Sequence, residues 1–249
     1  MFQLHAISNR LRRLPCPSFE LPTADFSHVL DFCGQLESLK VVPARGFGDF
    51  STKEEFLQHL INPIATSNIL PSTLTFDLVP FTSVTSLELI GIVPQNIENC
   101  EAVKQNVVNL CVKNTRANNT MQILMPDSIH NEVSIIHENQ SWKKVTYADL
   151  GNNDLWTLDE SMALLPYVED LRLNNNMIRT IKNLKTLYNL KHLDLGGNLI
   201  ENLKGWHVEL GNVESLNLSS NKIKSLEGLS RLKSLKNIDL SWNCIEDIA

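Results

Sequence analysis

His192 has the sequence neighbours from which acid–base or metal chemistry could be built, because the carboxylates Asp170 and Asp194 lie on either side of it. An imidazole beside carboxylates can relay protons or take part in holding a metal ion. A metal site needs further ligands, and no second histidine lies one repeat away in a sequence that is visibly repetitive. We therefore interpret these three side chains as surface neighbours and predict no metal site.

Catalytic signatures are missing elsewhere in the sequence. There is no G-x-S-x-G motif and no H-E-x-x-H motif, and Gly46-Phe47-Gly48 lacks the strand–loop–helix setting of a phosphate-binding loop. The cysteines form no C-x-x-C pair, which favours reduced thiols in the cytosol. They are Cys16, Cys33, Cys100, Cys111 and Cys244. We predict that the chain is not an enzyme and takes no cofactor.

Composition restricts the partners of the chain. Its 249 residues carry a formal net charge of -6, with 43% hydrophobic and 20% charged residues, which is ordinary for a globular protein. An acidic balance disfavours nucleic acid as a partner. No apolar run approaches the roughly 18 residues that span a bilayer, and the N-terminus has no signal-peptide pattern. We expect a cytoplasmic monomer that does not bind membranes directly.

The elements that would position any functional side chain come from a repeat in the second half of the sequence. The pattern L-x-x-L-x-L-x-x-N-x-I-x-x-I/L occurs five times between residues 145 and 249, and its asparagines are spaced by 23, 22, 23 and 22 residues. They are Asn153, Asn176, Asn198, Asn221 and Asn243. This period is typical of leucine-rich repeats. The sequence therefore predicts an α/β solenoid, or horseshoe, with short parallel strands on its concave face and short helices or turns on its convex face.

Each position that recurs in the repeat has a physical role. The leucines of L-x-L alternate with outward-facing residues along a strand, so they point into the solenoid interior. The asparagine amide both donates and accepts hydrogen bonds, so it can satisfy backbone groups where the chain turns after the strand. The later Ile/Leu pair packs the outer side, where Leu184 and Leu187, or Leu229 and Leu232, are expected to continue the outer layer through short helical turns. Trp206 falls in a similar outer turn, where we predict that it packs.

The pattern weakens upstream. Strand spacing is present around Val84-Leu87-Leu89, Val107-Leu110-Val112 and Leu36-Leu39-Val41, but Ile92 and Thr115 replace the asparagine after the first two. Helical spacing occurs over 26–36 and 52–61, and the loop after Val112 is expected to be extended around Gln122–Leu124. We predict an N-terminal cap and linker at 1–80 and a solenoid at 81–249, with degenerate repeats at 81–144 and regular repeats at 145–249.

The outward-facing residues of the predicted strands would form ladders across the concave face, because parallel strands lie about 4.8 Å apart. The sequence predicts a polar, mildly acidic strip with Tyr147 and Trp242 as aromatic anchors, suited to a basic segment of a partner protein. Its members are Tyr147, Asp149, Asp170, Arg172, His192, Asp194, Asn217, Asp239 and Trp242. In the alternative interpretation, Asp149, Arg172 and Asp194 neutralise one another as exposed pairs worth about 0–1 kcal/mol.

Particular segments resemble a known family. The stretches L-P-Y-V-E-D-L-R-L (165–173), N-L-K-T-L-Y-N-L-K-H-L-D-L (183–195) and L-G-N-V-E-S-L-N-L (210–218) are similar to repeats of the nischarin family. The similarity extends upstream to F-D-L-V-P-F-T-S-V (76–84) and H-V-L-D-F (28–32), and covers the chain from about Asp25 onward. The phosphoinositide-binding PX domain of that family has no counterpart in this sequence.

The resemblance implies a scaffold in cytosolic signalling. Nischarin-like proteins bind integrin cytoplasmic tails, small GTPases of the Rac and Rab kinds, and kinases that drive cell migration, in part at endosomes. The resemblance therefore implies the same classes of partner for this chain and an endosomal association through those partners. A different class of function stays open, in which the solenoid is a regulatory subunit that steers a phosphatase or another enzyme.

Overall fold

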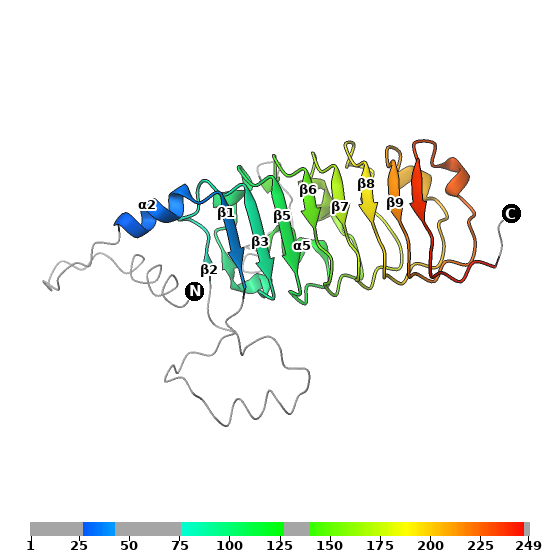
Figure 1. Cartoon of the computed structure of the whole chain (residues 1–249), viewed down its shortest axis with the longest axis horizontal. Helices are drawn as coiled ribbons and strands as arrows, with labels where there is room; N and C mark the ends of the chain where they lie inside the picture. The colour runs from blue at the N-terminus through cyan, green and yellow to red at the C-terminus, as the bar shows by residue number, and fades with distance from the viewer. Residues whose placement is uncertain (1–26, 43–75, 127–139, 247–249) are drawn as a thin grey trace, which may run out of the picture.

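The fold is a solenoid whose strands form one continuous sheet along one side. The computed structural model describes residues 27–42, 76–126 and 140–246. Eight parallel strands follow one another in the order β1-β3-β5-β6-β7-β8-β9-β10, so each strand pairs with the strand of the next turn of the coil. Figure 1 shows these strands side by side along the length of the molecule, with α2 at one end and β10 at the other. The prediction of a leucine-rich-repeat solenoid is confirmed.

The strands differ in length between the two parts of the sheet. The upstream strands are β1 (Ser38–Val41), β3 (Ser86–Ile90) and β5 (Asn109–Lys113). The regular repeats contribute β6 (Tyr147–Asp149), β7 (Asp170–Arg172), β8 (His192–Asp194), β9 (Ser215–Asn217) and β10 (Asn237–Asp239). The upstream strands predicted from the spacing of apolar residues are therefore all present. β1 lies within the segment assigned to the cap and forms the first strand of the sheet.

Short helices and turns return the chain from each strand to the next. They contain η2 (Pro94–Asn96), α4 (Glu101–Lys104), α5 (Thr120–Leu124), η5 (Glu160–Leu164), α6 (Trp206–Glu209) and η6 (Leu229–Arg231), while α2 (Ser27–Gln35) precedes β1. A second, two-stranded sheet pairs β2 (Phe76–Asp77) with β4 (Ile97–Glu98). The predicted helical turn at Leu229 and the packing of Trp206, which is 4% exposed, are confirmed. Leu184 and Leu187 are buried, but they lie between turns and not in a helix.

Three upstream predictions have different outcomes. The helix expected over 26–36 is present as α2, while the helix expected over 52–61 lies outside the described residues. The extended structure expected at Gln122–Leu124 is wrong, because these residues belong to α5. Asn119 caps this helix by accepting a hydrogen bond from the Gln122 N–H, and a side-chain acceptor at this position favours a helical first turn.

The core runs through the whole coil without a break. The inward-facing residues of consecutive strands stack on one another, and Leu87, Leu110 and Leu193 are each at most 2% exposed. All buried apolar residues of the described chain belong to one cluster. Burial of apolar surface between neighbouring repeats is the main stabilising contribution in such a coil, because no repeat can bury its own apolar face alone.

The asparagine ladder stabilises the regular repeats as predicted. Asn198 Nδ2 donates to the carbonyls of Leu173 and Leu195 at 3.0 and 2.9 Å, and its Oδ1 accepts from the Ile178 N–H at 3.0 Å. Asn153, Asn176, Asn221 and Asn243 make the equivalent bonds. Each amide therefore joins two turns of the coil and satisfies backbone groups that would otherwise be buried without partners.

Candidate protein-binding surface

The register of the sheet aligns outward-facing side chains into two rows, which together we call the strand face. One row contains Ser38, Ser86, Asn109, Tyr147, Asp170, His192, Ser215 and Asn237. The other contains Lys40, Glu88, Cys111, Asp149, Arg172, Asp194, Asn217 and Asp239. Eight of the nine predicted site residues lie in these rows, and Trp242 follows β10. The sequence prediction began at Tyr147 and missed the upstream members, although the spacing of their strands was visible.

Charges on the upstream part of the strand face are paired with one another. Lys40 Nζ lies 2.8 Å from a Glu88 carboxylate oxygen, and Lys113 Nζ lies 2.5 Å from Asp149 Oδ2. Burial acts to lower the pKa of Lys113, but the hydrogen bond to Asp149 and the carboxylate charge outweigh it, so the pKa is raised. Because each charge already has a partner, a binding protein would have to displace that partner to use it.

Tyr147 and Arg172 form one stacked unit beside these pairs. The Arg172 guanidinium lies 5.2 Å from the Tyr147 ring centroid, and Arg172 Nε lies 3.6 Å from Asp170 Oδ1. Burial, together with the Asp149 charge, raises the pKa of Tyr147. The interpretation in which Asp149, Arg172 and Asp194 neutralise one another is therefore wrong in its pairing. Asp149 pairs with Lys113 one strand upstream, and Arg172 pairs with Asp170 on its own strand.

Four of the predicted site residues also terminate their strands. The side-chain Oδ1 of Asp194 accepts a hydrogen bond from the Gly196 N–H at 2.9 Å, two residues further on. Asp149, Asn217 and Asp239 accept the same bond from Gly151, Ser219 and Ser241. Asp and Asn favour such local side-chain-to-backbone bonds. The occurrence of both residue types at this position means that the turn requires a side-chain oxygen and does not require a negative charge.

Asp149 differs from the other aspartates in its exposure. It is 4% exposed, because Lys113 and Tyr147 cover it. Asp194 is half-buried and Asp239 is exposed, and neither lies within ion-pair distance of a cation in the described part of the chain. The backbone hydrogen bond from Ser241 lowers the pKa of Asp239. The uncompensated negative charge of the strand face is therefore confined to β8–β10. Asp149 does not contribute to this charge, because it is buried and paired with Lys113.

The acidic residues along the adjacent rim are compensated, unlike Asp194 and Asp239. Glu169 pairs with Lys191 at 2.8 Å, and Glu214 pairs with Lys236 at 2.7 Å. These residues immediately precede their strands, so the pairs join neighbouring repeats along one edge. Exposed pairs of this kind contribute little to stability, about 0–1 kcal/mol each. With these rim pairs formed, Asp194 and Asp239 are the strand-face carboxylates without a paired cation in the described ranges.

Trp242 is the most exposed aromatic residue of the described chain, at 85%. Its φ angle of 57° lies in the left-handed region. The equivalent residues of the preceding four repeats share this conformation, and they are Asn152, Asn175, Gly197 and Ser220. A bulky residue is unusual at such an angle. Trp242 therefore projects from a turn position that small or amide residues occupy elsewhere.

His192 is exposed on β8, beside Asp170 in the same row and two residues before Asp194. The described residues contain no cluster of three or more histidine, cysteine or acidic side chains arranged to hold a metal ion. No helix within the described ranges is both long and apolar enough to cross a bilayer.

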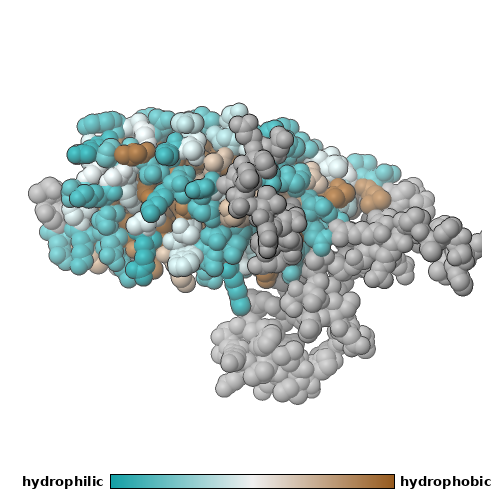
Figure 2. All heavy atoms as spheres, turned by 180° about the vertical axis from the view of Figure 1, so that it is seen from behind, coloured by the Kyte–Doolittle hydropathy of each residue, from teal (hydrophilic) through white to brown (hydrophobic). Residues whose placement is uncertain are grey.

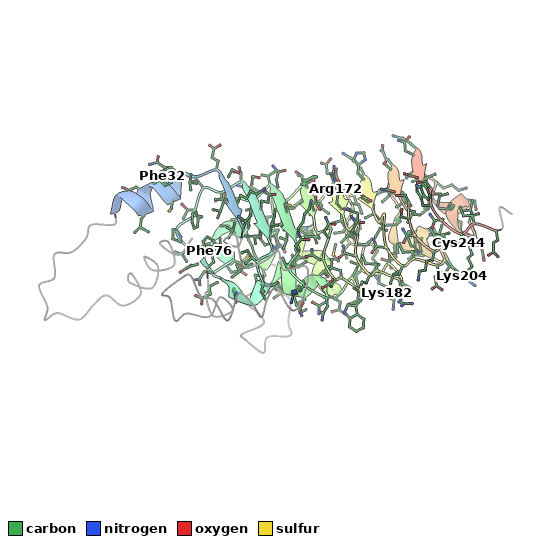
Figure 3. All side chains as sticks on the ribbon, turned by 60° about the horizontal axis from the view of Figure 1, so that its bottom comes forward. Phe32, Phe76, Arg172, Lys182, Lys204 and Cys244 are labelled. Atoms are coloured by element: carbon green, nitrogen blue, oxygen red, sulfur yellow. The ribbon has the colours of Figure 1, made fainter. Side chains whose placement is uncertain are left out.

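The two sides of the coil present different surfaces. In Figure 3, Arg172 lies on the strand side, whereas Lys182 and Lys204 lie on the opposite side. Figure 2 shows the back of the molecule, where hydrophilic residues predominate and hydrophobic residues reach the surface in separate areas. Exposed apolar side chains away from the strand face include Trp156, Met177 and Tyr188. The ordered rows of polar and aromatic residues therefore belong to the strand face.

Comparison with known proteins agrees with this architecture. The family model described as leucine rich repeat matches residues 189–245. A crystal structure of internalin C2 from Listeria monocytogenes superposes with a TM-score of 0.51 and 21% identity, over 71% of this chain and 71% of the internalin. A leucine-rich-repeat protein from Leptospira interrogans superposes with a TM-score of 0.51 and 17% identity, over 90% of this chain and 54% of that protein. The chain is thus a leucine-rich-repeat protein by fold.

Proposed function

We propose that this chain is a non-catalytic scaffold that binds a partner protein across the strand face, and that the β8–β10 part of this face receives a basic segment. The proposal rests on a difference along the two rows of the strand face, in which carboxylates upstream of β8 are paired and those on β8 and β10 are not. Among the residues that the structure describes, upstream carboxylates are paired or buried, whereas Asp194 and Asp239 have no cation beside them. Charged groups that are complementary across an interface raise association rates and select partners.

Two aromatic residues, Tyr147 on β6 and Trp242 after β10, support the same proposal. Trp242 follows the last strand and is 85% exposed, while Tyr147 is held in place by Arg172. Tyr, Trp and Arg are enriched among residues that dominate binding energy. Tyr147 and Arg172 are already ordered by their contact, so less conformational entropy is lost when a partner packs on them.

The resemblance of residues 165–173, 183–195 and 210–218 to nischarin repeats leads us to propose particular partners. They are integrin cytoplasmic tails, small GTPases of the Rac and Rab kinds, and kinases of cell migration. In this proposal the protein is cytoplasmic, monomeric, and associated with endosomes through its partners. Residues 1–80 act as a cap in the same proposal.

The test is a titration of the chain with a labelled integrin-tail peptide and with purified Rac and Rab proteins. The informative variant carries Asp194→Asn and Asp239→Asn, because Asn217 shows that an amide at this position still accepts the turn hydrogen bond. Only the charge is therefore removed. Its matched control carries Glu201→Gln and Glu227→Gln, which remove two exposed charges outside the strands.

We expect the strand-face variant to weaken binding of a basic partner by about 2- to 30-fold at low salt, which corresponds to two exposed charge contacts. The control variant should bind like the unmodified chain. Equal affinity of both variants would place the binding surface elsewhere. Failure of all these partners, with a phosphatase changing its rate on addition of the chain, would replace the scaffold proposal with the regulatory-subunit alternative.

A further inference from the structure

A group of cations lies on the outer side of the coil, in the segments that return the chain from β7, β8 and β9 to the next strand. Residues 177–189 contain three of them and no carboxylate, in a chain whose formal net charge is -6. Lys182 and Lys204 point to this side, away from Arg172 of the strand face (Figure 3). We call the six exposed cations of these segments the outer basic surface. They are Arg179, Lys182, Lys185, Lys204, Lys222 and Lys224.

The outer basic surface differs from the strand face and its rim in how its charges are paired. Five cations of the strand face and rim each form an ion pair, and they are Lys40, Lys113, Arg172, Lys191 and Lys236. None of the six outer cations pairs with a carboxylate of the described ranges. The nearby Glu209 carboxylate is already engaged, because it accepts from the N–H groups of Leu184 and Lys185 at 2.9 and 3.2 Å. The positive charge of this surface is therefore uncompensated within the part of the chain that the structure describes.

Backbone hydrogen bonds between repeats align the positions of this surface. The N–H groups of Met177, Leu199 and Lys222 donate to the carbonyls of Leu155, Ile178 and Ile200, each in the preceding repeat. Trp156, Arg179 and Glu201 directly follow these acceptors, so they occupy equivalent turn positions in three successive repeats. Lys182 and Lys204 are also equivalent, because each follows a buried apolar residue of the outer layer. The solenoid therefore fixes the spacing of these side chains from one repeat to the next.

Two exposed apolar side chains lie at the β6–β7 end of the outer basic surface. Trp156 is 64% exposed and Met177 is 50% exposed. The 2.8 Å hydrogen bond from the Met177 N–H to the Leu155 carbonyl places Met177 beside the segment that contains Trp156. Tryptophan and arginine are enriched among the residues that dominate binding energy, and Arg179 occupies the position equivalent to Trp156 one repeat further on. The surface therefore combines an apolar contact at one end with cations along the next three repeats.

We propose that the outer basic surface binds an acidic segment of a partner protein, and that one apolar side chain of that segment packs on Trp156 and Met177. Aspartate and glutamate supply the charge that this surface lacks, and complementary charge selects partners and speeds association. Glu201 favours a protein segment over a lipid surface, because it is exposed between the equivalent positions of Arg179 and Lys224. A continuous layer of lipid phosphates would repel this carboxylate, whereas a peptide can place an uncharged residue opposite it.

The test measures the fluorescence anisotropy of labelled synthetic peptides titrated with the full chain at low salt. The acidic peptide has one phenylalanine followed by aspartate and glutamate residues that alternate with serine, and a second acidic peptide has the reverse order. The uncharged control peptide carries asparagine and glutamine in place of the acids. The informative chain variant is Lys182→Gln/Lys204→Gln. Its matched control is Lys143→Gln/Lys144→Gln, which removes two exposed lysines from the edge that precedes β6.

We expect an acidic peptide to bind and the uncharged peptide not to bind. Lys182→Gln/Lys204→Gln should weaken binding by about 2- to 30-fold, as the loss of two exposed charge contacts implies, whereas the control variant should bind like the unmodified chain. Trp156→Ala should weaken binding as well. Tyr188→Ala should not, because Tyr188 is 74% exposed but lies outside the outer basic surface.

The test is independent of the strand face, which lies on the other side of the coil and carries the opposite charge. The Asp194→Asn/Asp239→Asn chain should therefore bind the acidic peptide with unchanged affinity. Absence of binding, or equal losses in the two lysine variants, would overturn the proposal. Adsorption of the chain to vesicles of phosphatidylcholine and phosphatidylserine, without binding of either acidic peptide, would overturn it in favour of a membrane surface.

Discussion

The regular repeats and the upstream repeats build the same sheet by different means. From β6 to β10 each strand has three residues, and an asparagine amide joins each repeat to the preceding one. In β3 and β5 each strand has five residues, and Ile92 and Thr115 stand where asparagines would be. In the upstream part, the longer strands pair through more backbone hydrogen bonds. In the regular part, the asparagine amides of the ladder satisfy backbone groups instead.

The junction between the two parts shows how they are joined. Asn153, the first amide of the ladder, accepts from both the N–H and the hydroxyl of Thr115 at 2.9 Å. Behind the sheet, Asp159 accepts from the Thr120 hydroxyl and the Met121 N–H, which ties η5 to α5. The asparagine is therefore one way to satisfy the backbone hydrogen-bonding groups of the turn. A repeat can lack it when neighbouring groups make those hydrogen bonds.

The largest expected effect comes from removing the upstream end of the sheet. A chain comprising residues 81–249 lacks β1 and exposes the edge of β3, where Leu87 and Leu89 are at most 3% exposed in the intact chain. We expect this truncated chain to aggregate, because an apolar edge strand promotes self-association. Size-exclusion chromatography with light scattering measures this. A monomeric, well-folded 81–249 chain would contradict the assignment of residues 1–80 as a cap.

Truncation of a core leucine should have an equally strong effect on stability in both parts of the coil. Leu195 and Leu87 are both fully buried in the same cluster. Leu195→Ala and Leu87→Ala should each lower the free energy of unfolding by about 2–5 kcal/mol. Urea denaturation followed by circular dichroism measures the loss. Two separate transitions in either variant would contradict a continuous core.

Loss of an amide should distinguish the two parts. Asn198→Ala removes an acceptor for Ile178 and donors for Leu173 and Leu195, so it should cost about 1–3 kcal/mol. Thr115→Ala keeps its backbone bond to Asn153 and loses the two hydroxyl bonds, to Asn153 Oδ1 and from the Ala117 N–H, and should cost less. The control is Asn189→Ala, an exposed asparagine outside the ladder. Equal losses for Asn198 and Asn189 would refute the structural role of the ladder.

The smallest expected effect is a gain in stability. Trp242 holds a left-handed φ angle at a position where Asn152 and Asn175 stand in earlier repeats. Because asparagine tolerates this region better than a bulky residue, Trp242→Asn should raise the free energy of unfolding by about 0.5–1 kcal/mol. Thermal unfolding measures the shift. A lower melting temperature would mean that the tryptophan makes a stabilising contact despite its exposure.

The sequence predicted most of the architecture because the fold repeats. Five copies of one pattern define the register of the strands, so the alignment of Asp170 with His192 and of Arg172 with Asp194 followed directly. Upstream, strand spacing survived the loss of asparagine, but the helix at Thr120–Leu124 did not carry a recognisable period. A five-residue helix fixed by one cap and by contacts to a neighbouring repeat has too few positions to show one.

The pairing of charges on the strand face was less accessible to sequence reasoning. Ladders place Asp149 near both Lys113 and Arg172, and only side-chain conformation decides which cation it meets. The structure pairs it with Lys113, because Arg172 turns over the Tyr147 ring towards Asp170. The separation of β8–β10 from the paired upstream surface therefore required the structure, because Lys40, Glu88 and Lys113 were not among the residues predicted for the site.

Hydroxyl-radical footprinting of the chain, alone and with the protein partner that binds in the titration, tests the central claim most directly. Oxidisable side chains lie on both sides of the coil: Tyr147, His192 and Trp242 on or beside the strand face, and Trp156, Met177 and Tyr188 away from it. We expect protection of His192 and Trp242, with the oxidation rates of Trp156 and Met177 unchanged. Protection of Trp156 and Met177, with His192 still oxidised at its original rate, would contradict it.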